Sequence, residues 1–335
     1  MSTTRREFLR HCGFVGATVT GSSLIPGIAL ANENKKRTTL TMYGPPIGPS
    51  VTLAHAAETG AIPSLVENLS FETYRNPDVL RANFVAGRWE LAGTPSYVAA
   101  NLHNKGLKVR LMNMMTWGLL YVISADENVK TIEDLKGQDI VMPFKADMPD
   151  LVFQHIATKK GMAVSKDYRL NYVSSPFKGL QLLLSGRAKH AVLPEPAATA
   201  ALLKGLTSAK KMTRVIDLQS AWGEVTGGPA RIPQAGMMVS DSLLDEMPDL
   251  PDRLNTALSR STDWVVNNPT SAGRLGETYI ELKAPVIERS IPFCNFGLSK
   301  AKEIQNEIES FYSILAETNP AIIGGRLPPD DFYLG

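Results

Sequence analysis

The sequence is poor in cysteine, carries almost no net charge and has no long hydrophobic run beyond its first 31 residues. Its 35 Lys and Arg side chains nearly balance 33 Asp and Glu side chains, which gives a net charge of +2. A chain with this balance lacks the basic surface that binds nucleic acid or an anionic membrane. No apolar segment after residue 31 is long enough to span a bilayer, so no transmembrane segment is predicted.

Motifs for metal binding and nucleophilic catalysis are also missing. His55, His103, His155 and His190 are scattered, and no His-x-x-x-His or Glu-x-x-His spacing occurs. Ser50 lies in Gly-Pro-Ser-Val-Thr rather than in the Gly-x-Ser-x-Gly turn that exposes a nucleophilic serine. We therefore predict no catalytic residue, no metal site and no cofactor.

The first 31 residues have the layout of an export signal. Arg5 and Arg6 precede a mildly apolar stretch, residues 12–24, and the small-residue run Ala29-Leu-Ala31 follows at the distance of a cleavage site. The paired arginines, with an apolar segment diluted by glycine and threonine, resemble a twin-arginine signal. We predict that residues 1–31 are a twin-arginine signal peptide cleaved after Ala31, and that the mature protein is located in the periplasm.

Cleavage removes one of the two cysteines and the small net charge. Three Arg and one Glu leave with the signal, so 32 basic and 32 acidic side chains remain. Cys12 also leaves, and Cys294 alone allows neither an intrachain disulfide nor a cysteine metal site. The residues after Ala31 are numerous enough for two domains, each with its own hydrophobic core.

The turn over residues 43–50 joins a strand-like run, residues 38–42, to a helix-like run, residues 51–59. Two glycines and three prolines in this turn can continue neither element, and Ser50 is placed to cap the helix. In open α/β sheets, ligands bind at the carboxyl ends of strands, where helix N-termini offer unpaired N–H groups. This turn is therefore either a ligand-binding turn or an ordinary connection.

Strand, turn and helix patterns then alternate along the chain. Asn76-Pro77 and Thr94-Pro95 predict helix starts, and Thr131 with Asp134 forms a capping pair where the pattern begins again. This alternation predicts two lobes, each a mostly parallel sheet flanked by helices, joined by two hinge crossings near Gly118 and Val239. The predicted first lobe covers residues 38–118 and 240–335, with C-terminal helices that return to cover it, and the second covers residues 119–239.

One short motif occurs in both predicted lobes. Ala86-Gly-Arg-Trp-Glu-Leu-Ala92 is similar to Ser185-Gly-Arg-Ala-Lys-His-Ala191, and each leads from the end of a helix through a short strand to a turn with proline. A chance match of short glycine-containing motifs is the alternative. If the repeat is genuine, the two lobes present equivalent turns.

Taken together, these motifs resemble a family of transport proteins. The export signal, the Tyr43–Ser50 turn, Thr131-Ile-Glu-Asp-Leu-Lys-Gly137 and Leu193-Pro-Glu-Pro-Ala-Ala-Thr199 are similar in order and spacing to the nitrate/sulfonate/taurine and pyrimidine-precursor group of periplasmic binding proteins. The resemblance implies a monomeric two-lobed clamp that closes on a small-molecule solute and delivers it to the permease and ATPase subunits of an ABC importer.

Position at strand ends is the basis for choosing candidate ligand-binding residues. The capping residues among them can also be structural only, the tryptophans can pack in the core, and a carboxylate between two prolines can be part of a bend. The candidates are Tyr43, Gly48, Pro49, Ser50, Asn76, Thr94, Ser96, Thr116 and Trp117 in the first lobe and Lys145, Asp147, Glu195 and Trp222 in the second.

The charges at these turns favour some ligands over others. Lys145 is the single cation among the candidates, and Asp147 and Glu195 offset it, whereas a sulfonate or phosphate needs converging cations. We therefore expect an uncharged or zwitterionic solute, planar enough to rest on Trp117 or Tyr43. We expect the Glu195 carboxylate to lie on the cleft rim and to accept a hydrogen bond from the ligand.

Two other classes of protein share this type of fold. The pyrimidine synthase of thiamine biosynthesis resembles it, but that enzyme group is intracellular and carries a cysteine cluster, and this chain departs from it on both counts. A sensory lobe pair of a receptor or regulator would need a transmembrane segment or a helix-turn-helix motif, and the sequence predicts neither.

Overall fold

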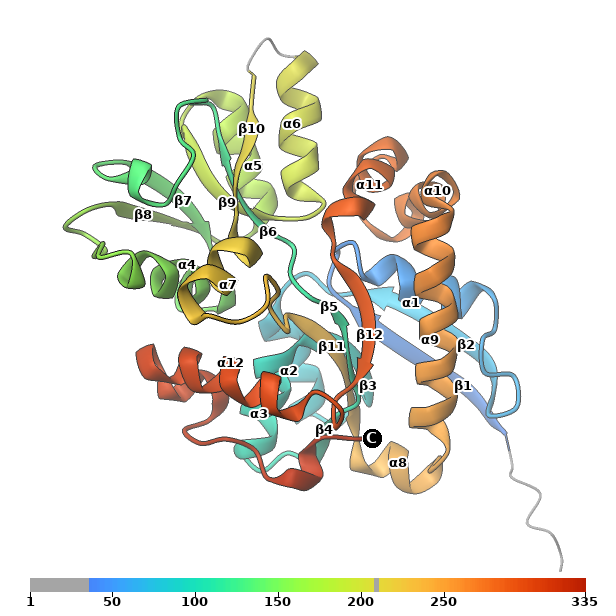
Figure 1. The fold of residues 1–335 in the computed structure, drawn as a ribbon. Helices are drawn as coiled ribbons and strands as arrows, with labels where there is room; N and C mark the ends of the chain where they lie inside the picture. Colours follow the sequence, from blue (N-terminus) through green and yellow to red (C-terminus); the bar gives the residue numbers. More distant parts are fainter. Residues whose placement is uncertain (1–35, 208–210) are drawn as a thin grey trace, which may run out of the picture. The chain divides into compact units, whose positions relative to one another are not determined.

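The computed structural model describes residues 36–207 and 211–335, so the predicted signal peptide, residues 1–31, lies outside the described residues. Two sheets, each flanked by helices, make up this part of the chain (Figure 1). The predicted two-lobed α/β fold is confirmed. None of the described helices is long and apolar enough to cross a membrane.

The first sheet has seven strands in the order β12-β5-β11-β3-β1-β2, and β4 pairs with β11. The strands β1, β2 and β3 are parallel, whereas β11 runs against β3, β4 and β5. The strands are β1 (Arg37–Gly44), β2 (Val66–Thr73), β3 (Leu91–Pro95), β4 (Val109–Leu111), β5 (Asn113–Thr116), β11 (Ala235–Ser240) and β12 (Phe296–Lys300). The helices of this first lobe are α1 (Ser50–Glu58), α2 (Pro77–Val85), α3 (Ser96–Asn104), α8 (Asp241–Glu246), α9 (Leu250–Asn267) and α10 (Pro269–Tyr279).

The second sheet has five strands in the order β10-β6-β9-β7-β8. Here β9, β7 and β8 are parallel, and β6 runs against both β9 and β10. Its strands are β6 (Leu120–Ser124), β7 (Asp139–Pro143), β8 (Arg169–Val173), β9 (His190–Pro194) and β10 (Thr213–Asp217). Its helices are α4 (Met148–Lys159), α5 (Pro176–Ser185), α6 (Ala197–Thr207) and α7 (Leu218–Thr226), and α11 (Ala284–Ser290) and α12 (Gln305–Thr318) come later in the chain.

Both sheets are therefore mixed, whereas the sequence predicted mostly parallel sheets. The parallel strands are those that follow one another through a helix, as the strand and helix pattern requires. The antiparallel strands β6 and β11 directly follow a crossing between the sheets, and each enters its sheet from the opposite end. The strand β11 lies in the first sheet, although the sequence prediction placed its residues 235–239 in the second lobe.

The helix starts show where local sequence rules hold and where they fail. Asn76 caps α2 by accepting hydrogen bonds from the N–H groups of Asp78 and Val79, as predicted. Ser50 does not cap α1, because it is already a helical residue and its hydroxyl donates to Pro45 O. Thr94 is not a cap either, because it lies inside β3, and α3 begins only at Ser96.

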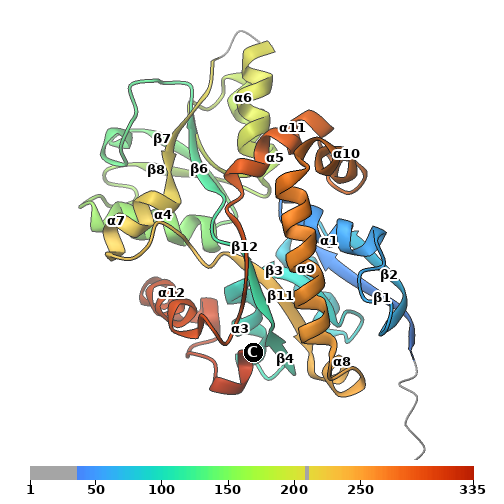
Figure 2. The same cartoon turned by 45° about the vertical axis from the view of Figure 1, so that its right-hand side comes forward.

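The hydrophobic core lies on both faces of each sheet. Successive residues of β11 point to opposite faces, so that Met237 packs with the residues of α1, α8 and α9 and Met238 packs with those of α3 and α12. Figure 2 shows α9 along one face of the first sheet and α3 on the other side.

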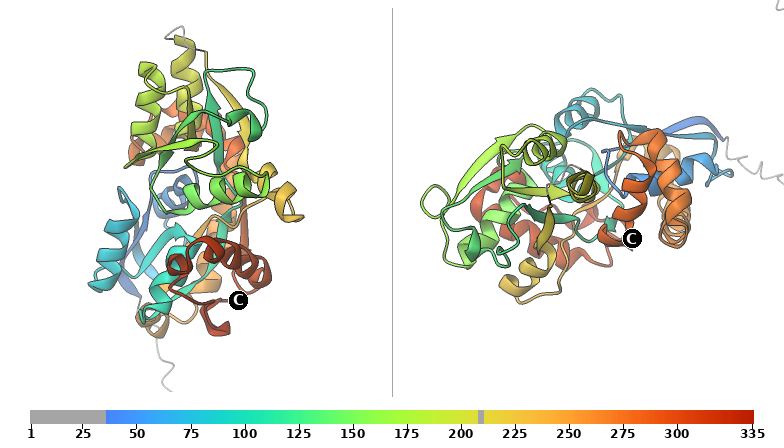
Figure 3. Two further views of the ribbon diagram at one scale, coloured as in Figure 1. Left: turned by 90° about the vertical axis from the view of Figure 1, so that its left-hand side faces the viewer. Right: turned by 90° about the horizontal axis from the view of Figure 1, so that it is seen from above.

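The C-terminal helices, which the sequence predicted to cover the first lobe, also contact the second. The helix α11 packs against α6, and α12 packs against α4. The Trp222 ring on α7 meets the Phe311 ring on α12 with centroids 5.5 Å apart. In the left view of Figure 3 the ribbon of α12 lies below that of α4.

The two crossings between the sheets are hydrogen-bonded to each other. Ile232 N donates to Trp117 O at 2.8 Å, and the N–H of Leu119 donates to Gln234 Oε1 at 2.9 Å. Gly118 has a φ of +119°, and a Cβ there would lie 2.1 Å from Gln219 Cγ. A third segment joins them at Asn295, whose side chain donates to Gly118 O at 2.9 Å.

A buried histidine on β9 predicts a loss of stability at acid pH. Burial lowers the pKa of His190, whose Nδ1 lies 3.0 Å from Ser124 Oγ. Burial also lowers the pKa values of His55 and His155. The unfolded chain then binds protons more tightly, so the free energy of unfolding should fall as the pH drops below 6.5, by at most about 1.4 kcal/mol per pH unit for each histidine.

Urea unfolding between pH 7.5 and pH 5.0 measures this slope. The His190→Asn variant keeps a hydrogen-bonding group near the position of Nδ1 and cannot be protonated, so its slope should be shallower than that of the wild type. Identical slopes for the two proteins would contradict the prediction.

Candidate functional site

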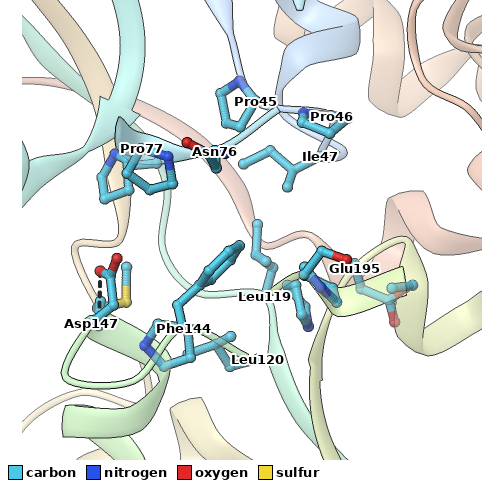
Figure 4. A pocket seen from close by; sticks show the side chains of 18 of the residues that line it. Pro45, Pro46, Ile47, Asn76, Pro77, Leu119, Leu120, Phe144, Asp147 and Glu195 are labelled. Atoms are coloured by element: carbon cyan, nitrogen blue, oxygen red, sulfur yellow. Dashed lines mark hydrogen bonds between the residues drawn. The ribbon is translucent and has the colours of Figure 1, made fainter. Parts of the chain in front are cut away.

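A cavity of about 130 Å³ lies where turns from the two sheets meet (Figure 4). Each of these turns follows a strand or belongs to a crossing, so both sheets contribute to the wall. The lining residues of the first lobe are Pro45, Pro46, Ile47, Tyr74, Arg75, Asn76, Pro77 and Pro95. Those of the crossings and the second lobe are Leu119, Leu120, Phe144, Asp147, Met148, Pro149, Ser175, Pro176, Phe177, Pro194, Glu195, Pro196, Ala197, Gln234 and Ala235.

Four helices, α2, α4, α5 and α6, begin at this cavity, and a side chain accepts an N–H group in the first turn of each. At α6 this side chain is Glu195, which accepts the N–H of Thr199. Asn76 caps α2, Asp147 accepts the N–H of Met148 at 2.8 Å at the start of α4, and Ser175 accepts the N–H of Lys178 at 3.3 Å at the start of α5. Eight of the lining residues are prolines, which have no N–H to donate.

Few donors are therefore left for a ligand oxyanion. An open helix N-terminus binds anions through its free N–H groups. Here side chains already accept five of these groups, and Pro77, Pro149 and Pro176 have none. The five belong to Asp78, Val79, Met148, Lys178 and Thr199. Arg75 is the single cation among the described residues that line the cavity, and its side chain is exposed to solvent. The wall is suited to an uncharged, largely apolar molecule.

The turn between β7 and α4 holds an aromatic side chain in the cavity. Phe144 has a φ of +59° and Ala146 a φ of +57°, a region that residues with a side chain rarely adopt. The buried Asp150 carboxylate accepts the N–H of Ala146 at 2.7 Å, and Phe144 N donates to Val173 O at 3.0 Å. Figure 4 shows the Phe144 ring pointing into the cavity. A strained turn with this support positions the ring.

Asp147 and Glu195 are the acidic residues of the wall. Burial raises the pKa of Asp147, and its hydrogen bond from Met148 N lowers that pKa in part. Glu195 is fully buried, and its carboxylate accepts hydrogen bonds from Thr199 N at 3.0 Å and from the guanidinium of Arg214. The sequence prediction placed this carboxylate on the cleft rim for a ligand, but in the structure both oxygens are bound inside the second lobe.

Arg214 connects the cavity wall to the third segment at the crossings. Its guanidinium lies 3.6 Å from the centroid of the Phe293 ring and 4.8 Å from that of Tyr121. The Tyr121 hydroxyl donates to Phe293 O at 2.9 Å. Arg214 thus pairs with the buried Glu195 carboxylate and also lies against two aromatic rings.

A chamber of about 20 Å³ adjoins the main cavity within the first lobe. Pro45, Ile47 and Ala235 line both spaces, and the other walls of the chamber are Pro49, Ser50, Leu53, Gly93, Thr94, Met115 and Gly236. Thr94 is fully buried, and its side chain lies beside the Tyr74 side chain. Burial raises the pKa of Tyr74, a residue of the main cavity, and the nearby Thr94 side chain lowers it in part.

A family model described as NMT1/THI5 like matches residues 91–272, more than half of the chain. The chain belongs to the NMT1/THI5-like family. The match begins at β3 and ends in α10, so it includes the whole second sheet and both crossings. No curated protein matches the sequence.

Solved structures share the fold of this NMT1/THI5-like protein. An ABC transporter protein from Parabacteroides distasonis is 24% identical, with a TM-score of 0.72 over 90% of this chain and 99% of that chain. The periplasmic aliphatic sulphonate binding protein SsuA from Escherichia coli is 12% identical, with a TM-score of 0.70 over 90% and 92%. The periplasmic nitrate-binding protein NrtA from Synechocystis PCC 6803 is 13% identical, with a TM-score of 0.59 over 76% and 70%.

The structure of this family member brings together six of the residues predicted from sequence. Asn76, Asp147 and Glu195 line the main cavity. Pro49, Ser50 and Thr94 line the small chamber. The remaining predicted residues, Tyr43, Gly48, Ser96, Thr116, Trp117, Lys145 and Trp222, line neither space.

The aromatic and basic residues outside the site have other partners. Tyr43 stacks on Trp89 with ring centroids 3.9 Å apart, and Lys145 lies over the Tyr172 ring. Trp117 donates its indole N–H to Gly297 O and lies under the guanidinium of Arg231 at 4.0 Å. Trp222 is buried between the rings of His155 and Phe311.

The small residues outside the site are part of the framework around the crossings. A Cβ on Gly48 would lie 2.3 Å from Cys294 Sγ, so this glycine allows the first turn to pack against the third segment. The Thr116 hydroxyl donates to Cys294 O, and the Ser96 hydroxyl donates to Pro233 O at 2.8 Å.

Sequence reasoning missed most of the apolar wall, in particular Ile47, Leu119, Phe144 and Phe177, as well as Arg75. It selected polar residues from the predicted turns, although the same turns contain these apolar side chains. The prolines at positions 77, 149, 176 and 196 were the available signal, because prolines at helix starts remove the donors that a polar ligand needs.

Proposed function

We propose that this protein is the periplasmic solute-binding component of an ABC importer and that it encloses one small uncharged organic solute between its lobes. The observation that carries the proposal is the apolar cavity, to which turns at strand ends of both sheets contribute. Pockets of this kind at the carboxyl ends of strands are typical ligand sites in α/β proteins.

The similar structures support the class of function. The Escherichia coli and Synechocystis proteins are described as sulphonate-binding and nitrate-binding, and both share the fold. The closed helix N-termini around the present cavity argue for a different ligand, because a sulfonate or nitrate would find few free N–H groups.

The proposal includes export and lobe closure. Residues 1–31 would be removed as a twin-arginine signal, and the mature monomer would deliver its solute to a permease and an ATPase subunit. We place the hinges at residues 117–119 and 227–234 rather than at Val239, because β11 is an integral strand of the first sheet. The thiamine-precursor synthase is not proposed, since the sequence lacks its cysteine cluster.

Ligand binding is expected to close the lobes and to stabilise the protein. A thermal-shift screen of uncharged aromatic and aliphatic solutes should find at least one that raises the Tm, and at 100 times its Kd a ligand adds about 2.7 kcal/mol to the free energy of unfolding. Small-angle X-ray scattering with that solute at saturation should show a smaller radius of gyration.

Sodium nitrate at the same concentration is the control and should leave the radius of gyration unchanged. A saturably bound solute that produced no compaction would contradict the clamp.

A further inference from the structure

We propose that Gln234 donates a side-chain N–H group to a carbonyl oxygen of the solute, so that the solute is an uncharged carbonyl compound such as a ketone, an amide or a lactam. The inference rests on the proposed function and names the chemistry of the solute. Gln234 lies at the end of the second crossing, directly before β11, and lines the main cavity.

Three polar side chains of the described cavity wall are buried, and two of them are already bound. The Tyr74 hydroxyl donates to Gly93 O at 2.9 Å, and both Glu195 oxygens accept hydrogen bonds within the second lobe. The third is Gln234, which is 6% exposed and whose Nε2 has no hydrogen-bond partner in the described part of the chain. Buried polar groups are nearly always hydrogen-bonded, so a free one on a residue of a cavity wall indicates a ligand atom.

A hydrogen bond from the first crossing fixes the orientation of the Gln234 amide. The N–H of Leu119 donates to Oε1 at 2.9 Å, so this oxygen points to the crossing and Nε2 carries the two free protons. The backbone N–H of Gln234 donates to Thr116 O at 3.2 Å, and its C=O accepts the N–H of Ser96 at 3.1 Å. The NH2 group is therefore the part of Gln234 that remains for a ligand.

A second glutamine holds the same crossing and has a complete set of hydrogen bonds. The Oε1 of Gln219 accepts the N–H of Leu120 at 2.9 Å, and its Nε2 donates to Leu120 O at 3.1 Å and to Asp217 Oδ1 at 3.0 Å. Gln219 does not line the main cavity, whereas Leu119 and Gln234 do. The crossing uses only the oxygen of Gln234, which leaves its NH2 group to the solute.

The free NH2 group selects a neutral acceptor that carries no proton of its own. An amide N–H is a neutral donor, and a carbonyl oxygen only accepts. An ionised acceptor would be buried without a counter-charge, because Arg75 is the single cation of the described wall and is exposed to solvent. A hydroxyl or amine would bring a proton, and the buried Glu195 carboxylate that could accept it is already bound.

Three probes with the same ring test this hydrogen bond by isothermal titration calorimetry. Acetophenone carries a carbonyl oxygen, ethylbenzene has a methylene group in its place, and benzoate carries an ionised acceptor. The phenyl ring suits a wall that contains Phe144 and Phe177. Benzoate should bind the wild type at least about tenfold more weakly than acetophenone.

The ratio of the ethylbenzene and acetophenone dissociation constants is compared between wild type and variants, which cancels the different hydration of the two probes. Gln234→Met should lower the preference for acetophenone at least about fivefold, because the carbonyl oxygen then lacks a donor. Gln234→Glu keeps an acceptor for Leu119 N, and at pH 8.5 its ionised carboxylate has no proton to donate. It should lower the preference as well, and it serves as the test where the methionine variant does not fold.

Gln219→Met is the matched control. It also removes an acceptor from an N–H of the first crossing, but it leaves the Gln234 NH2 group in place. Its ratio should stay within about twofold of the wild-type ratio. A lower melting temperature in this control, with the ratio unchanged, would separate a loss of stability from a loss of recognition.

Several results would overturn the role of Gln234. They are a wild-type ratio in its variants, an equal fall of the ratio in Gln219→Met, binding of benzoate as tight as that of acetophenone, or no binding of acetophenone to the wild type. The proposed function is judged separately by scattering with the solutes of the thermal-shift screen. Compaction by a bound solute with unchanged ratios would overturn the role of Gln234 and keep the clamp. The expected ratios without compaction by any bound solute would do the reverse.

Discussion

Replacing Arg214 by methionine is expected to lower the free energy of unfolding by about 3–5 kcal/mol, because it leaves the Glu195 carboxylate buried without a counter-charge. Glu195 is fully buried and the side chain of Arg214 is 14% exposed, so water cannot replace the guanidinium. The variant also loses the stacking of the guanidinium on Phe293 and Tyr121. Urea unfolding at pH 7.5 measures the difference.

The effect of pH separates charge burial from lost packing. Burial raises the pKa of Glu195, and Arg214 opposes that rise, so the pKa should rise further in the variant. A carboxylate with a raised pKa in the folded protein becomes protonated at a higher pH, and protonation removes its buried charge. The deficit of the Arg214→Met variant should therefore shrink as the pH falls from 7.5 toward the ordinary glutamate pKa of 4.5.

The double variant Arg214→Met/Glu195→Gln is the control, because it removes both charges. It should recover much of the lost stability at pH 7.5 and show little of the pH effect. A single variant that unfolds within about 1 kcal/mol of the wild type would contradict the importance of this pair.

Replacing Phe144 by glycine is expected to weaken binding of the solute identified by the thermal-shift screen by about 10- to 100-fold without destabilising the free protein. The ring supplies a large apolar contact within the cavity, and glycine removes it. Glycine also accepts a φ of +59°, which offsets its greater freedom in the unfolded chain. The free energy of unfolding of the variant should equal that of the wild type or exceed it by up to about 1 kcal/mol.

Ala146→Gly is the matched control for this variant. Ala146 has nearly the same φ and lies in the same turn, but its side chain does not line the cavity. It should gain the same stability and keep wild-type affinity. If Phe144→Gly binds as tightly as Ala146→Gly, the ring does not contact the solute.

Local rules in the sequence determined the elements and the general fold. The alternation of strands and helices and the cap at Asn76 act within a few residues of the chain, and the structure confirms both. The turns after the two copies of the short motif contain Pro95 and Pro194, and both prolines line the cavity. Such features depend on backbone dihedral preferences and on hydrogen bonds between near neighbours.

The tertiary structure alone decided which side chains form the site. Turn position predicted Asn76, Asp147 and Glu195, but it could not show that their oxygens are already bound within their own lobes. The partner of Glu195 is Arg214 on another strand, and burial gives that pair its energy. The chamber at Thr94 exists because β3, β11 and the first turn meet there, and no spacing within the chain records that contact.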